Sequence, residues 1–233
     1  MPPSKHTASV VEITNPSTTF YRIIFEVHNV DTFDFAPGQF VALRVDENKV
    51  NDYSIASLPN GNRFELIIDI KPGHEGSYFV HDLQAGDQVN FLGPVGSFVY
   101  HPDDGAEQIV LLATGSGIAP LKSIAEQLLF RNQDTRPIHL YFGLRTCSDI
   151  FLHEYFQDIM ARFPNFSFSP CLSRPDMFWR GECGHITDLL KQDYPDGSKL
   201  AGYMCGNKLM IEETKAILEK IGTPKERIYS EAF

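Results

Sequence analysis

Apolar and polar positions follow two different patterns along the chain. From residue 7 to residue 100, short runs rich in β-forming residues predominate, and the clearest of them alternates apolar with polar side chains at Phe64, Leu66, Ile68 and Ile70. A period of two is typical of strands with one buried face, and Gly- and Pro-containing turns separate the runs. This half is therefore predicted to form a small antiparallel, six-stranded β-barrel, with one short helix near SYFVHDL.

Beyond residue 107 the pattern changes to apolar runs followed by helical spacing. The run 109–113, IVLLA, is short, branched and uncharged, which suits a strand buried on both faces of a parallel sheet. Apolar residues then recur at three- and four-residue steps from Leu121 to Leu129, as in a helix packed on that sheet. Further strands are expected at IHLYFG, FSFSPC, GYMC and RIYS, and helices over 152–163, ITDLLKQ and NKLMIEETKAILEKI. Such alternation predicts a doubly wound parallel α/β unit whose ligands bind at the carboxyl ends of the strands.

The turn after the run 109–113 is the first candidate for binding chemistry. Gly115 and Gly117 allow a ligand to approach the backbone, and a helix beginning near Pro120 offers free N–H donors, which suits a phosphate. A Gly-rich turn after a strand is equally compatible with plain α/β connectivity. It also differs from the common dinucleotide fingerprint, because Pro120 occupies the position of the third glycine and no acidic residue closes the next strand.

Charge and length narrow the classes of partner. The chain has 233 residues, enough for one large domain or two small ones, and a formal net charge of -10. This charge argues against nucleic acid and anionic membrane surfaces as partners. No apolar run reaches membrane-spanning length, and the first residues lack the features of a signal peptide. We therefore expect a protein of the cytoplasm.

Cysteines and histidines give no metal-binding pattern. No C-x-x-C pair occurs, and the eight histidines have no ligand spacing, so no metal site is expected. In a cytoplasmic protein the cysteines are expected to be reduced and mostly buried. They are Cys147, Cys171, Cys183 and Cys205.

The order of seven short segments resembles the ferredoxin-NADP reductase family, especially stand-alone flavin reductases and the reductase parts of bacterial oxygenase systems. The segments are DYSIAS, EGSYFVHDL, GPVGSF, ATGSGIAP, YFGLRT, CGNKLM and IYSEAF. Together they cover almost the whole chain. The resemblance implies a flavin-binding β-barrel over residues 1–103 and an NAD(P)-binding α/β domain over residues 104–233.

The resemblance assigns the flavin to residues of the first half and of the C-terminus. Tyr53 matches the aromatic ring that lies against the isoalloxazine, and Ser54 matches the hydroxyl that bonds N5, where hydride arrives. Tyr-Ser is also ordinary barrel sequence. Asn51 departs from the family, which has at this position an arginine that pairs with the flavin phosphates. Glu231 and Phe233 match acidic and aromatic positions near the flavin ring.

Two further segments match the family's flavin contacts. Gly76 and Ser77 correspond to the helix start that receives the flavin pyrophosphate, although Ser77 serves equally well as a simple N-cap. Ile70 and Lys71, at the end of their strand, correspond to backbone that passes the flavin, with the Lys71 side chain in solvent.

For the nicotinamide cofactor, Gly115, Ser116, Gly117 and Pro120 match the family's pyrophosphate turn. Four residues after the next two strands are candidates for ribose and phosphate contacts, with a 2'-phosphate as the target of the last two, although a surface turn explains the latter equally well. They are Arg145, Thr146, Ser173 and Arg174.

Cys205, followed by Gly206, matches the cysteine beside nicotinamide C4, a position that a small buried filler also explains. With Ser54 and Glu231, Cys205 completes the catalytic set implied by the resemblance. The expected protein is an NAD(P)H-dependent flavoenzyme that uses FAD and passes electrons to a separate acceptor: ferredoxin, free flavin or an oxygenase component. A monomer or weak dimer is expected. The alternative, motivated by Asn51, is a flavin-less nucleotide-binding regulatory module, which a colourless purified protein would indicate.

Overall fold

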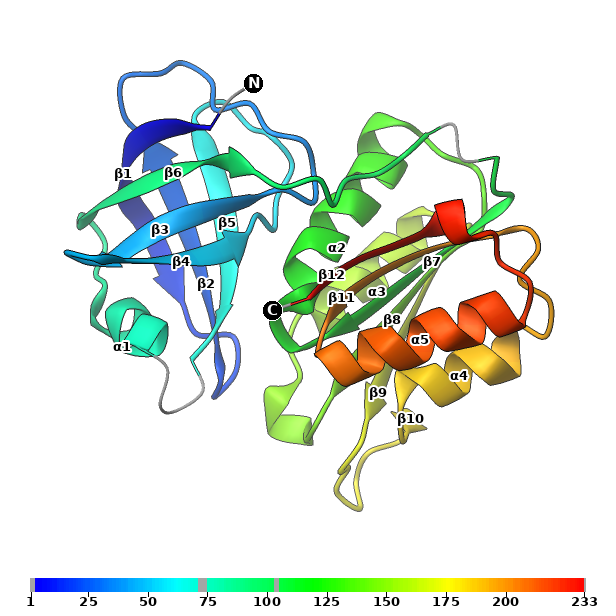
Figure 1. The fold of residues 1–233 in the computed structure, drawn as a ribbon. Coiled ribbons are helices and arrows are strands. Elements are labelled where there is room, and N and C mark those ends of the chain that lie inside the picture. Colours follow the sequence, from blue (N-terminus) through cyan, green and yellow to red (C-terminus); the bar gives the residue numbers. More distant parts are fainter. Residues whose placement is uncertain (1–2, 71–74, 103–104, 233) are drawn as a thin grey trace.

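The computed structural model describes residues 3–70, 75–102 and 105–232, without the side chains of residues 75–77. Within this part, two six-stranded sheets lie side by side, one antiparallel and one parallel (Figure 1). The first has the order β4-β3-β6-β1-β2-β5. Its strands are β1 Ser4–Thr14, β2 Phe20–Val27, β3 Phe40–Asp46, β4 Lys49–Ser54, β5 Arg63–Asp69 and β6 Gln88–Val95. The predicted short helix is α1, Glu75–Asp82.

The antiparallel sheet curls until its two end strands meet. An isolated bridge joins Ile55, after β4, to Leu66 in β5, and the Ala56 amide donates to the Glu65 carbonyl at 2.8 Å. The alternating apolar positions of β5 explain the interior, because Phe64, Leu66 and Ile68 are buried and pack into one core. The predicted six-stranded barrel is confirmed as this curled sheet.

The parallel sheet has the order β10-β9-β8-β7-β11-β12. All of its described strand pairs are parallel, as the alternation of strands and helices predicted. The two-residue strand β10 was not foreseen in the sequence. The strands are β7 Gln108–Thr114, β8 Ile138–Leu144, β9 Phe166–Leu172, β10 Glu182–Cys183, β11 Leu200–Gly206 and β12 Ile228–Ala232.

Helices cover both faces of the parallel sheet (Figure 1). Leu111 points into a core with α2 Ile118–Glu126 and α3 His153–Arg162, whereas its neighbour Leu112 joins α4 Ile186–Asp193 and α5 Lys208–Lys220 on the other face. The expected helix over 121–129 ends its α-helical part at Glu126 and continues as a π-helical turn, Gln127–Arg131. The predicted doubly wound arrangement is confirmed.

Helix α2 lies between the two sheets and packs on both (Figure 1). Phe20, Ile67 and Phe98 from the first half share a core with Ile124 of α2. Strand β12 ends at the junction between the two halves. The expected domain boundary, between residues 103 and 104, falls outside the described residues. Among those described, no helix is long and apolar enough to cross a membrane.

Candidate active site

A cavity of about 260 Å³ opens where the two sheets meet. It collects residues from β3, β4 and β5 of the barrel, from the turn after β7 and from the last strand. The predicted residues Tyr53, Ser54, Ser116 and Glu231 all line it. The other lining residues are Phe40, Asp52, Ile67, Ile68, Asp69 and Ala232.

Strand β4 supplies the predicted residues on the barrel side of the cavity. It pairs antiparallel with β3, which places Tyr53 opposite Val41 and Ser54 opposite Phe40. Asn51 Nδ2 donates to the Tyr53 hydroxyl at 3.4 Å, so these two side chains lie together. Burial raises the pKa of Tyr53, so its phenol remains neutral at ordinary pH and offers a flat, half-buried ring.

Glu231 on β12 faces Ser54 across the junction. The Ser54 hydroxyl hydrogen-bonds the Glu231 carboxyl, and Asp52 adds a second carboxylate nearby. Burial, and then repulsion from Asp52, raise the pKa of Glu231 to about 7, although the Ser54 contact acts in the opposite direction. Burial also raises the pKa of Asp52. Near neutral pH, Glu231 can therefore both hold and release a proton.

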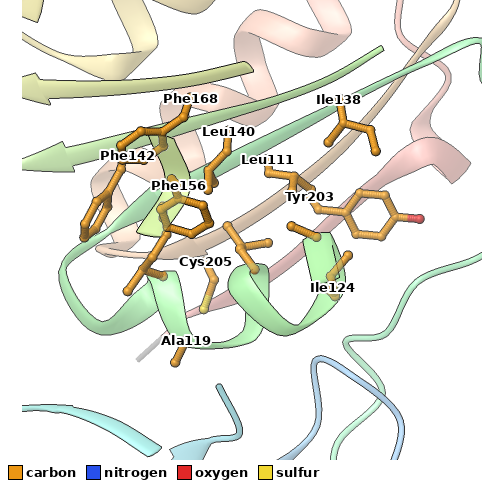
Figure 2. Close-up of a cluster of buried hydrophobic side chains, with 14 of the residues drawn as sticks. Leu111, Ala119, Ile124, Ile138, Leu140, Phe142, Phe156, Phe168, Tyr203 and Cys205 are labelled. Atoms are coloured by element: carbon orange, nitrogen blue, oxygen red, sulfur yellow. The ribbon is translucent and has the colours of Figure 1, made fainter. Parts of the chain in front are cut away.

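Cys205 lies directly beside Glu231, because these residues are register partners in β11 and β12. Its side chain is fully buried in the core between the parallel sheet and α2, on the same side of the helix as Leu111 (Figure 2). Burial, and secondarily the charge of Glu231, raise the pKa of its thiol well above the ordinary value. Cys205 is therefore a neutral thiol at physiological pH and not an activated nucleophile.

The turn after β7 lies against the end of β11. A side chain at Gly117 would place its Cβ 2.1 Å from the Cys205 carbonyl oxygen, so only glycine permits this approach. The Asn207 amide, just after Gly206, donates to Thr114 Oγ1 at 2.9 Å and ties the two segments together. Pro120 occupies the first turn of α2, where it removes no helical hydrogen bond. The Ile118 amide already donates to the Gly115 and Ser116 carbonyls, so the helical segment begins at the turn Gly115–Gly117, and the free N-terminal amides belong to this turn.

The candidates at the ends of β8 and β9 form a second group outside the cavity lining. Arg145 and Arg174 are exposed, and the Arg174 amide donates to the Arg145 carbonyl at 2.7 Å. The Thr146 hydroxyl donates to Asp149 Oδ2 at 2.8 Å within a capping box. Ser173 is exposed, and its amide donates to the Leu144 carbonyl. Thr146 thus has a local structural partner, whereas the two guanidinium groups extend toward solvent.

The remaining candidates lie at the barrel or outside the described part. Ile70 is partly buried against the barrel core, and its amide donates to the Thr19 carbonyl at 2.8 Å. Gly76 and Ser77 belong to α1, and their side chains lie outside the described residues, as do Lys71 and Phe233.

Sequence reasoning missed Asp52, although it stands between two residues that were selected. Its side chain lines the cavity and acts on Glu231, which lies 179 positions further along the chain by difference of residue numbers. Phe40 and Asp69 were missed as well. The available signal was the strand pairing itself, since β3 and β5 flank the segment that carries Tyr53 and Ser54.

Two family models match the two halves of the chain. The oxidoreductase FAD-binding domain matches residues 7–100, and the oxidoreductase NAD-binding domain matches residues 111–216. The expected cofactors, FAD and a nicotinamide dinucleotide, are thereby confirmed. The FAD-binding model spans β4, and the NAD-binding model spans the turn after β7.

The curated relatives include reductases of multicomponent systems. The chain is 33% identical over 236 residues to an aromatic O-demethylase reductase subunit from Amycolatopsis sp., covering 97% of this chain and 69% of the relative. It is 30% identical to the ferredoxin--NAD(P)(+) reductase component of the naphthalene 1,2-dioxygenase/salicylate 5-hydroxylase systems from Ralstonia sp.. This match covers 86% of this chain and 61% of the relative. The chain thus spans about 61 to 69% of the length of these two relatives.

Solved structures confirm the same architecture. A cytochrome P450 reductase from Amycolatopsis superposes with a TM-score of 0.91 at 30% identity, over 100% of this chain and 70% of that one. A ferredoxin NADP+ reductase from Neisseria gonorrhoeae with bound FAD and NADP superposes with a TM-score of 0.82 at 21% identity, over 100% and 99%. The second likeness concerns the fold alone.

Proposed function

We propose, since this chain belongs to the ferredoxin-NADP reductase family, that it oxidises NAD(P)H and reduces FAD, which then passes electrons to a separate acceptor. The reaction is NAD(P)H + H⁺ + FAD → NAD(P)⁺ + FADH₂, in which one hydride carries both electrons. Bound FAD would supply the hydride-accepting chemistry. The chain supplies orientation, hydrogen bonds and a proton-holding group.

The observation that carries this proposal is the cavity shared by the two halves. Tyr53 and Ser54 come from the FAD-matching half, whereas Ser116 and Glu231 come from the C-terminal half. A flavin ring against Tyr53 and a nicotinamide held by the turn after β7 would therefore meet at one place. Proximity of this kind is the main requirement of a hydride transfer between two bound cofactors.

We assign roles according to atoms that reach the cavity. Tyr53 orients the flavin ring, and the Ser54 hydroxyl serves N5, where negative charge develops. Glu231, with a pKa of about 7, exchanges a proton through its contact with Ser54. Cys205, as a neutral thiol behind Glu231, fills the nicotinamide side without nucleophilic chemistry.

Phosphate groups are assigned to amides and cations. The turn Gly115–Gly117, with Pro120 in the following helix and Gly206 opposite, binds the nicotinamide pyrophosphate, while α1 receives the flavin pyrophosphate at Gly76 and Ser77. Ile70 is assigned to the flavin through its backbone. The resemblance also assigns Lys71 and Phe233 to the flavin, and both lie outside the described residues. Arg145 and Arg174, with Thr146 and Ser173, serve the adenosine end of the nucleotide.

The acceptor, location and domain limits belong to the same proposal. We favour a protein acceptor, because the Ralstonia relative is the reductase component of dioxygenase and hydroxylase systems. Four free thiols suit the cytoplasm, which is a reducing compartment. We place the FAD-binding part over residues 1–103 and the NAD(P)-binding part over residues 104–233, in a monomer or weak dimer.

The test is the reduction of bound flavin. Purified protein, reconstituted with FAD, is mixed anaerobically with NADH or NADPH, and flavin bleaching is followed. Full bleaching within one turnover, followed by reoxidation with ferricyanide, is expected. A protein that binds nicotinamide nucleotides but is colourless once FAD has been added and the unbound FAD removed contradicts the proposal. That result supports the flavin-less module. Turnover with a ferredoxin, compared with free FAD or FMN, then separates the two acceptor classes.

A further inference from the structure

A buried, charged cluster joins the two halves beside the cavity. Lys122, Glu65 and Glu126 are 5%, 7% and 7% exposed. The Lys122 ammonium donates to the Ala56 carbonyl at 2.7 Å and lies 2.7 Å from Glu126 Oε1. Glu65 Oε1 lies 3.3 Å away, in ion-pair contact and not in an aligned hydrogen bond. Lys122 thus contacts two segments of the barrel and one carboxylate of its own helix.

The cluster is electrically balanced and supported from both sides. Arg22 of the barrel lies 2.8 Å from Glu65 Oε2, and the Tyr155 hydroxyl of α3 donates to Glu126 Oε1. Within the buried part, two cations therefore face two anions, and Arg22 also pairs with the half-exposed Glu12 at 3.1 Å. Such balance is needed, because an unpaired charge at this burial is strongly unfavourable.

The position of Lys122 connects the two cofactor-binding segments. Its acceptor, Ala56, follows Ser54 by two residues and extends the strand that lines the flavin side of the cavity. Lys122 itself lies five residues after Gly117, in the helix that begins at the nicotinamide turn. One side chain therefore joins the two backbone segments whose relative placement sets the distance between the cofactors.

Neighbouring contacts would hold the halves together without Lys122. The Gly38 amide of the barrel donates to Ser123 Oγ of α2 at 3.0 Å, and Thr19 donates to Asp149 at 3.0 Å. Phe20 stacks on Phe151 with ring centroids 4.5 Å apart. The association of the two halves therefore does not depend on Lys122 alone. The directional contacts of Lys122 instead select one placement of the two halves relative to each other.

Buried ion pairs contribute little net stability compared with apolar residues of similar volume, but their directional bonds can specify one arrangement. We propose that Lys122 is a positioning residue that fixes the nicotinamide turn relative to the flavin-binding strand. The inference rests on the proposed function, because the geometry in question is that of the hydride transfer. It adds to that function a residue that touches neither cofactor.

The test compares two variants and one control. Lys122→Met leaves Glu126 without a cation and Glu65 with Arg22 as its one remaining cation, and can fail to fold. The triple variant Lys122→Met/Glu65→Gln/Glu126→Gln removes Lys122 and both buried carboxylates, while Arg22 keeps Glu12 as its partner. It tests the same question if the single variant does not fold. The control is Lys191→Met, which removes a half-exposed lysine that pairs with Asp188 and Glu213 on α4 and α5.

Four kinds of measurement are made on each folded variant. We expect single-turnover flavin reduction at saturating NAD(P)H to slow by about ten- to a hundredfold, because a misplacement of about 1 Å can cost about a hundredfold. Affinities for FAD and NAD(P)H should stay at the wild-type values, because Lys122 touches neither cofactor. The long-wavelength absorption of the nicotinamide–flavin complex should weaken, and hydrogen exchange of the Gly38 amide in FAD-free protein should accelerate. Lys191→Met should change none of these.

The outcomes separate this inference from the proposed function. Wild-type reduction rate and unchanged long-wavelength absorption in the folded triple variant would overturn the positioning role. If Lys122 has a purely structural role, the triple variant is less stable but reduces flavin at the wild-type rate at low temperature. That result would also overturn the positioning role. If the wild-type protein itself fails to reduce FAD, the proposed function fails. The Gly38 exchange rate still reports whether Lys122 fixes the junction.

Discussion

At the scale of single residues, burial acts on two neighbouring acids in the same direction with different results. Cys205 and Glu231 are register partners, and burial raises the pKa of both. The thiol is thereby kept neutral throughout the physiological range, whereas Glu231 reaches a pKa of about 7. Only Glu231 therefore changes its charge under working conditions, and it does so in contact with Ser54.

This shift predicts a pH-dependent stability. The pKa of Glu231 is 4.5 when unperturbed and about 7 in the folded protein, so the folded state holds its proton more tightly. The stability from this group is fully present below about pH 4.5 and is lost as the pH rises through about 7. Glu231→Gln, which is always neutral, should therefore gain stability relative to wild type between pH 5 and pH 8.

Urea unfolding of the FAD-free protein at these two pH values measures the effect. Asp52→Asn should shift the pH window downward, because it removes the second cause of the raised pKa. A stability difference between Glu231→Gln and wild type that is the same at both pH values would show that Glu231 titrates normally.

Asn51 gives a second prediction at this scale. The family arginine would bind the flavin pyrophosphate through charge-assisted bonds of about 1.5 to 3 kcal/mol, which a neutral amide cannot replace. Asn51→Arg should therefore tighten FAD binding by about ten- to a hundredfold. Titration of apo-protein with FAD measures this change.

The matched control for Asn51→Arg is Val50→Arg, at the adjacent position of β4. Val50 is 59% exposed, and successive side chains of a strand point to opposite faces. The same charge is thus added on the other face. Equal tightening by both variants would indicate general electrostatic attraction, and no tightening by Asn51→Arg would show that another group already serves the pyrophosphate.

At the scale of elements, most of the fold follows from the hydrophobic pattern. The alternation at Phe64, Leu66 and Ile68 gave the correct inner face of β5, because one face of a barrel strand must be buried. The burial of the other face of β5 could not be foreseen. Glu65 and Ile67 are also buried, because α2 packs there, and a local pattern contains no information about a helix 50 or more residues away.

The candidate site shows the same division. Four of the predicted residues could be selected because short sequence motifs mark them, and the structure brings them together in one cavity: Tyr53, Ser54, Ser116 and Glu231. Asp52 and the Lys122 cluster were not predicted, because their effect depends on side chains brought together only by packing of the two halves. The assigned roles themselves stay predictions until variants are measured.

The ends of β8 and β9 give a prediction about nucleotide choice. The Arg174 amide bonds the Arg145 carbonyl, so two exposed cations lie on adjoining segments. If Arg174 binds the 2'-phosphate, Arg174→Ala should cost about 1.5 to 3 kcal/mol for NADPH and leave NADH unaffected. Steady-state kcat/KM with both nucleotides measures this difference.

Arg180→Ala is the control for Arg174→Ala. Arg180 belongs to the same loop, but its guanidinium donates to the Met177 and Trp179 carbonyls at 2.9 and 3.1 Å. Its removal should affect NADH and NADPH alike. An equal change for both nucleotides in Arg174→Ala would identify that residue as part of a surface turn only.

At the scale of the whole molecule, Gly38 is one of the places where the two halves meet. This residue has a φ of +103°, and its amide donates to Ser123 of α2. A Cβ at this position would lie 2.1 Å from the Phe98 carbonyl oxygen and 3.2 Å from the Ile124 side chain. The backbone of the barrel and the helix of the second half therefore leave no room for a methyl group.

Gly38→Ala should consequently destabilise the protein for two separate reasons. The positive φ costs about 1 to 3 kcal/mol for a non-glycine residue, and forcing a methyl group into packed surroundings adds about 1 to 3 kcal/mol. Gly86→Ala isolates the first cost, because Gly86 has a φ of +98° and a Cβ added there would meet no described atom within 4 Å.

Urea unfolding of both variants should therefore show Gly38→Ala to be the less stable by about 1 to 3 kcal/mol. The overlap at 2.1 Å is with Phe98 of the same half, but Ile124 of α2 lies within 3.2 Å of the added methyl group. Gly38→Ala should therefore also displace α2 and slow flavin reduction, whereas Gly86→Ala should not. Equal stability losses and equal reduction rates in the two variants would mean that the junction yields to an added methyl group, and that the close contact at Gly38 does not constrain how the halves are placed.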